Sequence, residues 1–189
     1  FKALKDKTDT EPYPLAKKTL EVLIDNADLA KDNMMPICQD TGMAFVYITI
    51  GQEVHVDGDL KAAINEGVRQ GYEEGYLRKS VVAEPLFNRK NTQNNTPAII
   101  YTEIVPGDKV DIQVELKGFG SENKSDVAML VPADGVEGVK NAVLEIVKHA
   151  GPNPCPPIVL GIGIGGTMDQ AAVMSKKALR RYLSVPHKD

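Results

Sequence analysis

The sequence predicts an α/β protein in which a mixed sheet, including an antiparallel hairpin, packs against helices. Three observations favour this fold class. Short runs of β-branched and aromatic residues alternate with longer segments in which apolar residues recur at helical spacing. Two of the short runs are close enough in sequence to form a hairpin. The other runs are separated from them by predicted helices, so both parallel and antiparallel pairing are expected.

The first half of the chain predicts helix, strand and helix in that order. Residues 14–33 form an amphipathic pattern with charges between the apolar positions. The run MAFVYITI at 43–50 is rich in β-branched and aromatic residues, is too short for a buried helix, and ends at Gly51, so it predicts an interior strand. Asp59 is suited to cap the N-terminus of a helix that runs to about Leu77.

Three glycines share one face of this last helix, namely Gly67, Gly71 and Gly75. Each glycine costs about 1 kcal/mol relative to alanine in a helix interior. Three in register therefore predict that another backbone packs closely against that face. The same helix ends by projecting Arg78 and Lys79 into the following loop.

The second half begins with two apolar runs, 96–105 and 109–116, joined by Pro-Gly-Asp. They predict the plainest hairpin in the chain. Ile112, Val114 and Leu116 alternate with polar residues, so one face of the second strand is expected to be buried and the other exposed.

Loops and helices are predicted beyond this hairpin. Residues 117–125 predict a polar loop that contains glycine, and a helix is expected from 135 to 150 with Gly151 as its stop. An apolar strand begins at about residue 158 and leads through a glycine turn to a helix that opens at Thr167, where Gln170 completes a capping box.

Composition limits the classes of function. The 189 residues are 42% hydrophobic, which suits one domain or two small lobes. A net charge of −4 without a Lys/Arg block argues against nucleic acid or an anionic membrane surface as partner. No apolar run of about 18 residues and no signal-type N-terminus are present, so we expect a cytoplasmic protein. Because the chain starts at Phe1 and stops soon after a helix, it is expected to be truncated or incomplete after about residue 180.

Two cysteines, Cys38 and Cys155, are the first candidates for chemistry. They are too few for a secreted disulfide scaffold, and each lies in a loop stiffened by proline or by a strand start. Because each also borders an apolar strand near glycine and acidic residues, a shared site is favoured. Next to the first thiol, Gln39 and Asp40 offer an amide beside a carboxylate. That carboxylate suits acid/base chemistry, but it equally suits the start of a tight turn.

GIGIGG at residues 161–166 contains the glycine spacing of a dinucleotide-binding turn between a predicted strand and a helix. A nucleotide-binding module is therefore an alternative of a different class. The acidic residue expected about 20 positions later has no strand to carry it. A plain strand-to-helix turn explains the glycines equally well.

Five motifs in order, from residue 12 to about residue 180, resemble the alpha part of the class I iron-sulfur fumarase and tartrate dehydratase family. They are PICQDTG, GYLRKS, NNTPAIIYTEIVPGD, KGFGSENKS and NPCPPIVLGIGIGGT. The resemblance implies a 4Fe-4S cluster held by three cysteines, with one iron left open as a Lewis acid. Cys38 and Cys155 fall on two of the ligand positions, and the third has no counterpart in this chain.

The resemblance also implies roles for other residues. Gln39 and Asp40 would contact the substrate, with Asp40 as the catalytic group, and Arg78 would pair with a substrate carboxylate. The backbone at Gly118 and Gly120 would close around the substrate. Three further residues would bound the cluster pocket, namely Gly165, Gly166 and Thr167.

A hydro-lyase that interconverts (S)-malate and fumarate is the leading expectation, and L-tartrate dehydration to oxaloacetate is the alternative within the same class. A structural remnant without a cluster is a further alternative. In this family, other carboxylate-binding residues come from a beta-type subunit or C-terminal domain. The chain is therefore expected to need such a partner and to form homo-oligomers of alpha or alpha-beta units.

Overall fold

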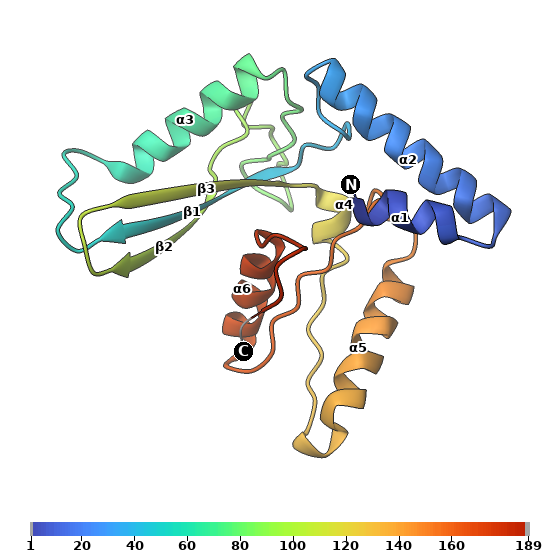
Figure 1. The fold of residues 1–189 in the computed structure, drawn as a ribbon. Helices are drawn as coiled ribbons and strands as arrows, with labels where there is room; N and C mark the ends of the chain where they lie inside the picture. The colour runs from blue at the N-terminus through green and yellow to red at the C-terminus, as the bar shows by residue number, and fades with distance from the viewer. Residues whose placement is uncertain (1, 188–189) are drawn as a thin grey trace. The chain divides into compact units, whose positions relative to one another are not determined.

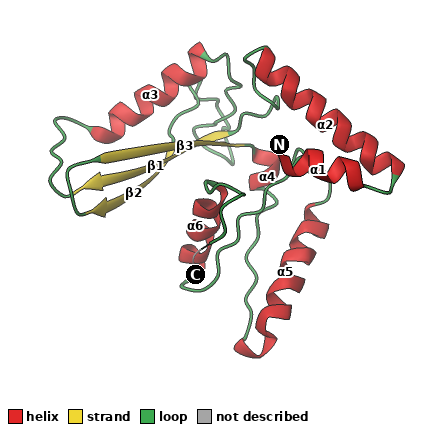
Figure 2. Ribbon diagram, in the orientation of Figure 1, coloured by secondary structure: helices red, strands yellow, loops and turns green. Residues whose placement is uncertain are grey.

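The computed structural model describes residues 2–187, and the chain divides into two compact units (Figure 1). Unit 1 contains the residues up to Met43 together with Asp57–Ala98. Unit 2 contains Ala44–Val56 and the residues from Ile99 onward. Each unit is thus built from two stretches of the chain. The chain contains both helices and strands, as Figure 2 shows, and α3 separates β1 from β2, so the predicted α/β class is confirmed.

Unit 1 is built on helices α1 (Lys2–Thr10), α2 (Pro14–Asp32) and α3 (Leu60–Glu74). The predictions for α2 and α3 are confirmed. Proline at the first position of α2 is already set to the helical φ, and the Asp59 carboxylate accepts the N–H of Ala62 at 2.9 Å as the cap of α3. Helix α1 was not predicted because its nine residues carry only two apolar side chains.

The expectation of close packing at the α3 glycines is wrong. A Cβ placed on Gly67 or Gly71 would meet no other atom within 4 Å among the described residues. The buried side chains of α3 are Val68 and Tyr72, each one position further along the helix. The helix therefore buries the face beside its glycines and leaves the glycine face open.

Unit 2 holds a three-stranded sheet in the order β2-β1-β3. Its strands are β1 (Met43–Gly51), β2 (Ile99–Val105) and β3 (Val110–Lys117). Strands β1 and β2 are parallel, with Phe45 opposite Ile99. The mixed sheet is confirmed, but the predicted hairpin is wrong because β1 lies between the two strands that were expected to pair.

The short connection between β2 and β3 crosses the end of β1. The N–H of Gly51 donates to Lys109 O at 2.8 Å, and the N–H of Glu53 donates to Gly107 O at 3.0 Å. A Cβ on Gly51 would lie 2.2 Å from that Gly107 oxygen, so the crossing requires glycine. A sequence of two apolar runs joined by a turn does not reveal an inserted third strand.

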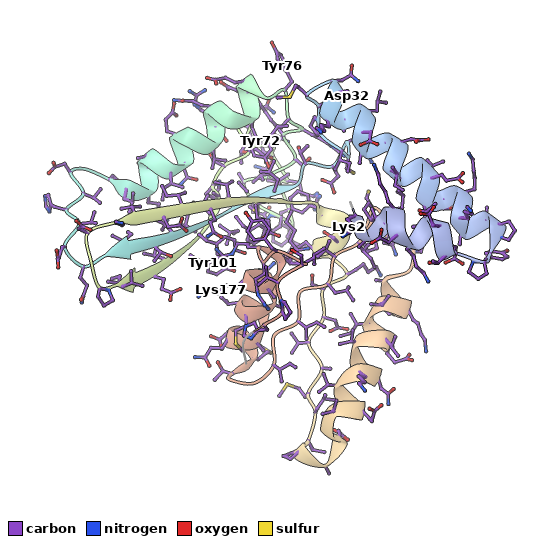
Figure 3. The ribbon with its side chains drawn as sticks, in the orientation of Figure 1. Lys2, Asp32, Tyr72, Tyr76, Tyr101 and Lys177 are labelled. Carbon is purple, nitrogen blue, oxygen red and sulfur yellow. The ribbon has the colours of Figure 1, made fainter. Side chains whose placement is uncertain are left out.

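The core of unit 2 is the central strand. Residues 44–48 of β1 are all at most 5% exposed. The expected burial of the apolar face of β3 is wrong, since Ile112 and Val114 are 56% and 60% exposed. Side chains of α6 (Met168–Leu179) and of the residues after it instead contact the polar face, where Arg180 donates to Gln113 at 2.6 Å. Figure 3 labels Tyr101 on β2 and Lys177 on α6, the elements that meet there.

The remaining elements are α4 (Phe119–Glu122), a 3-10 turn at 132–134 and α5 (Gly135–Ala150). Helix α5 ends at Gly151 with φ 54°, as predicted. The predicted polar loop at 117–125 is partly wrong, because α4 forms one helical turn within it. Among residues 2–187, no helix has both the length and the apolar character needed to cross a membrane.

The approach to α6 differs in part from the prediction. The capping box of Thr167 and Gln170 is confirmed. The apolar strand expected from about residue 158 is not formed, and the segment runs outside the sheet. A Cβ on Gly161 or Gly163 would lie 2.0 or 2.2 Å from backbone oxygens of α6, so this segment packs its glycines against the helix.

Candidate active site

The PICQDTG segment forms the loop between α2 and β1, as the sequence predicted. Its thiol, Cys38, is partly exposed. The backbone N–H of Asp40 donates to the Cys38 sulfur at 3.4 Å, and the Gln39 side-chain oxygen lies 3.5 Å from the same sulfur. Donors aimed at cysteine sulfur are among the features that tune iron–sulfur sites. The sulfur receives one backbone N–H and itself donates to the Gln39 oxygen, and its role as a metal ligand stays a prediction.

Asp40 takes part in a turn. Its Oδ1 accepts the N–H of Gly42 at 3.0 Å, and Gly42 has φ 59°, a conformation that favours glycine. The alternative in which Asp40 begins a tight turn is thus observed. A turn that fixes the carboxylate also fixes its direction, so a catalytic role for Asp40 stays a prediction.

Arg78 is joined to this loop through a threonine. The Thr41 hydroxyl accepts the backbone N–H of Arg78 at 3.0 Å and lies 3.3 Å from the Arg78 carbonyl oxygen. The Arg78 side chain is exposed. Unit 1 therefore brings the predicted carboxylate-binding residue to the loop that carries the predicted catalytic aspartate, although 37 positions separate the two bonded residues.

Asn95 completes this connection. It is fully buried at 0% exposure, and its Oδ1 accepts the N–H groups of Ser80 and Val81 at 2.7 and 2.9 Å. Its Nδ2 donates to the carbonyl oxygen of Gly42 at 2.9 Å. A single amide thus links the segment after Arg78 to the end of the Cys38 loop.

Tyr72 reaches the same loop from α3, with its hydroxyl 3.0 Å from the Thr41 carbonyl oxygen. Burial raises the pKa of this hydroxyl, so Tyr72 is a neutral donor at any physiological pH. We call Thr41, Tyr72 and Asn95 the neutral latch. Asn95 has φ 57°, a conformation that asparagine tolerates well.

In unit 2, the predicted substrate glycines lie at the end of β3. Gly118 is the N-cap of α4 and Gly120 is within its single turn. A Cβ on Gly120 would lie 2.7 Å from the carbonyl oxygen of Asn153, which is two residues before Cys155. Unit 2 therefore brings the glycine turn next to the loop of the second cysteine, whose side chain is exposed.

A charged group holds this turn. Glu122 accepts from Lys176 of α6 at 2.6 Å and lies 3.5 Å from the Lys117 ammonium at the end of β3. Burial, the largest effect, lowers the pKa of Lys117, while Glu122 acts in the opposite direction. We call Lys117, Glu122 and Lys176 the ionic latch. Within the segment predicted as a polar loop, Glu122 therefore has partners on β3 and α6.

Gly165, Gly166 and Thr167 form the turn that opens α6. Both glycines have positive φ, 88° and 71°, which accounts for the residue type. The Thr167 hydroxyl lies 2.5 Å from the Asp169 carboxylate, and this bond lowers the pKa of Asp169. A carboxylate thus already sits at the N-terminus of the helix, where a nucleotide phosphate would have to bind. The preceding strand that a dinucleotide fold needs is not formed in the described chain either.

The predicted metal ligands lie in different units, Cys38 in unit 1 and Cys155 in unit 2. Within residues 2–187, no group of three His, Cys, Asp or Glu side chains is arranged to hold a metal ion. With only two cysteines in the sequence, the chain offers at most two of the three thiolates that the resemblance implies. A cluster shared by the two cysteines stays a prediction.

A model of the fumarate hydratase (fumerase) family matches residues 1–189, the whole of the chain. The chain belongs to this family. The resemblance drawn from the five motifs is thereby confirmed. Its implications for individual residues remain those of the family until they are measured on this chain.

Curated relatives cover nearly all of the chain. A protein of Methanocaldococcus jannaschii, provisionally named L(+)-tartrate dehydratase subunit alpha, is 41% identical over 99% of this chain and 67% of its own length. The L(+)-tartrate dehydratase alpha subunits of Escherichia coli strain UTI89 and Shigella sonnei are each 30% identical over 97% of this chain. The chain spans 61% of the length of these two relatives.

Proposed function

We propose that this chain is the alpha part of an iron–sulfur hydro-lyase that removes water from a 2-hydroxy dicarboxylate. The match of the family model to all 189 residues carries this proposal. It is supported by two loop connections, in which the neutral latch holds Arg78 to the Asp40 loop and the glycine turn packs beside the Cys155 loop.

Cys38 and Cys155 would supply two thiolates to a 4Fe-4S cluster, and a cysteine outside these residues would supply the third. When bound, such a cluster provides an open iron that acts as a Lewis acid toward a hydroxyl group. Both loops suit this use because neither thiol is buried in an apolar core and the Cys38 sulfur receives a backbone N–H. An oxygen-sensitive cluster also fits the proposed cytoplasmic location.

The residues of the chain would bind and orient the dicarboxylate. The Arg78 guanidinium can pair with one carboxylate as a two-pronged donor. Gln39 and the backbone N–H groups at Gly118 and Gly120 would hold the rest of the substrate. The Asp40 carboxylate, fixed by its turn, would hold or accept a proton. Gly165, Gly166 and Thr167 would border the cluster.

Two substrates are supported by different observations. The name of the family model supports (S)-malate and fumarate, whereas the names of the relatives support L-tartrate. The relatives' designation as alpha subunits also supports a beta-type partner that completes the site. We propose that the assembled enzyme pairs alpha and beta parts and repeats them in a homo-oligomer.

Anaerobic assembly of the complete protein with its beta-type partner, followed by iron and sulfide reconstitution, tests the proposal. We expect a broad absorbance at about 400 nm that is lost in Cys38→Ser and in Cys155→Ser. Turnover is then measured separately with malate, fumarate and L-tartrate, and the ratio of kcat/KM values identifies the substrate. Absence of both iron uptake and turnover, together with NAD binding, would instead favour a nucleotide-binding module.

Arg78→Ala provides the matched test of substrate binding. It should abolish dicarboxylate turnover and leave the cluster absorbance intact, because its side chain is exposed and only its backbone joins the neutral latch. Arg89→Ala, an exposed arginine in the same unit, is the control that should retain activity. Unchanged kinetics in Arg78→Ala would remove this residue from the site.

A further inference from the structure

Glu122 joins two elements of unit 2 that are far apart in sequence. Lys176 approaches both of its carboxylate oxygens, at 2.8 and 2.6 Å, from 54 positions away. Lys117 approaches it at 3.5 Å from the end of β3. The side chains of Lys117 and Lys176 are only 9% and 16% exposed. Such charges interact more strongly than pairs in open solvent, and they are costly to leave unpaired.

The same group of residues reaches the backbone of the glycine turn. Lys117 Nζ lies 3.0 Å from the Ser121 hydroxyl, and that hydroxyl donates to the carbonyl oxygen of Gly118 at 2.9 Å. Helix α4 has four residues, too few to be stable by its own hydrogen bonds. The conformation of residues 118–122 is therefore set by the ionic latch rather than by local helix formation.

The opposite side of the turn contacts the loop of the second cysteine. Gly120 lies so close to Asn153 that a Cβ would meet its carbonyl oxygen at 2.7 Å. A shift of the turn would therefore move the loop that leads to Cys155. The ionic latch joins the glycine turn to the end of β3 and to helix α6, and the backbone of the same turn packs against the loop before Cys155.

We propose that Glu122 is a positioning residue for dicarboxylate binding, which it serves by fixing the Gly118–Gly120 backbone through Lys117 and Lys176. The inference rests on the proposed function, because it takes the glycine turn as part of the substrate site. Glu122 itself touches no reacting atom in this scheme. Its carboxylate holds the backbone N–H groups in place before the substrate arrives, which lowers the entropic cost of binding.

Glu122→Gln in the assembled, reconstituted enzyme is the primary test. Two properties are measured: the hydrogen exchange of peptides covering 117–123 and 150–156, and the separate values of kcat and KM. We expect faster exchange in both peptides and a KM raised about tenfold, with kcat changed by less than about threefold. A purely structural defect would instead lower kcat through loss of active enzyme and leave KM unchanged.

Two variants of Lys176 provide a second test, one that removes the charge and one that keeps it. Lys176→Met should raise KM in the same direction as Glu122→Gln, whereas Lys176→Arg should keep KM within about twofold of the wild type, since arginine retains the charge. This pair keeps the proposal testable even where Glu122→Gln yields little folded protein. Glu137→Gln, which removes an exposed carboxylate paired with Lys140 on α5, is the control that should alter neither property.

Unchanged exchange at 117–123 in Glu122→Gln would overturn the proposal, whatever the activity. An unchanged KM in both Glu122→Gln and Lys176→Met would overturn it as well. Failure of the proposed function is seen separately, because the wild-type enzyme would then turn over neither malate nor tartrate. In that case the exchange data still decide whether the ionic latch orders the turn.

Discussion

The two units hold their candidate site residues by different chemistry. Unit 1 uses neutral groups: a buried amide, a threonine hydroxyl and a tyrosine hydroxyl fix the loops of Asp40 and Arg78. Unit 2 uses ions, since a glutamate between two lysines fixes the glycine turn. Both latches join segments far apart in the chain, 53 positions for Asn95 with Gly42 and 54 for Lys176 with Glu122.

The difference teaches what each region can tolerate. A neutral buried network has no charge to screen or titrate near neutral pH, so its strength should be independent of salt and of moderate changes in pH. The ionic latch reaches solvent through Glu122, whose side chain is 35% exposed, so added salt should weaken it. We therefore expect the loop of the first cysteine to be held constantly, whereas the hold on the glycine turn varies with conditions.

Removal of the Asn95 amide should have the largest effect. Asn95→Gly keeps the left-handed backbone accessible and removes only the side chain, which takes the acceptor from the backbone N–H groups of Ser80 and Val81. The Gly42 carbonyl oxygen loses one donor and keeps the Tyr72 hydroxyl at 3.2 Å. The expected loss in the free energy of unfolding is about 4 kcal/mol, measured by urea denaturation. Asn95→Ala should lose about 1 kcal/mol more, because alanine is strained at φ 57°.

The control for this prediction is Asn88→Ala, at an exposed position in the same unit. It should change the free energy of unfolding by less than about 0.5 kcal/mol. The loss in Asn95→Gly should also be the same at low and high salt. A strong salt dependence would contradict the neutral character of this latch.

Loss of the central charge in the ionic latch should have the next largest effect. Glu122→Gln leaves Lys117 and Lys176 facing each other and should lower the free energy of unfolding by about 2 kcal/mol. Lys117→Met removes a charge that burial already disfavours, so it should cost less than about 1 kcal/mol. Both values come from urea denaturation, and equal losses in the two variants would argue against the assigned roles.

The pH dependence of unit 2 offers a smaller effect. Burial raises the pKa of Glu115 above its ordinary 4.5, so its folded state holds a proton more tightly than the unfolded state. The resulting stabilisation is complete below pH 4.5 and is lost as the pH rises through the raised pKa. Glu115→Gln should remove this pH dependence of the free energy of unfolding. The free energy of unfolding is measured from pH 4, about half a pH unit below the ordinary pKa of glutamate, up to pH 8.

Glu103 should give the opposite pH dependence of the free energy of unfolding, so it serves as a control. Its bond with Lys177 lowers the pKa of Glu103, so the corresponding stabilisation is present above the ordinary pKa and is lost as the pH falls through the lowered value. Glu103→Gln should therefore make the protein less sensitive to acid. If Glu115→Gln and Glu103→Gln changed the pH dependence of the free energy of unfolding in the same direction, burial would not be the cause of the raised pKa of Glu115.

The open glycine face of α3 gives the smallest effect. Gly67→Ala should raise the free energy of unfolding by about 0.7 kcal/mol, because alanine is the better helix former and its Cβ meets no other described atom within 4 Å. The change lies in unit 1 and outside the neutral latch. Thermal unfolding measures the gain, and a loss of stability would indicate that a partner or a further part of the protein packs on this face.

Local patterns predicted the helices of this chain well and its sheet less well. Helices α2, α3 and α5 were predictable because periodicity and caps lie within a few residues of one another. The order of the strands was not, since it depends on β1 lying between two segments that follow it in sequence. The extended segment from about residue 158 has strand-like composition, but it packs on α6 instead of the sheet.

The candidate site divides in the same way. Motifs made Cys38, Asp40 and Arg78 candidates, because a thiol, a carboxylate and a guanidinium are groups with recognisable chemistry. They did not identify Asn95 or Glu122, because asparagine and glutamate in polar loops are ordinary in sequence. Only the fold reveals that one is completely buried and the other lies between two lysines.

The position of β1 between β2 and β3 has a consequence for synthesis of the protein. This apolar strand leaves the ribosome with 47 residues still to follow before Ile99, the first residue of β2, and its second neighbour ends only at Lys117. During that interval an aggregation-prone run has neither of its final strand neighbours. Newly made chains should therefore depend on chaperones until β2 and β3 have been synthesised.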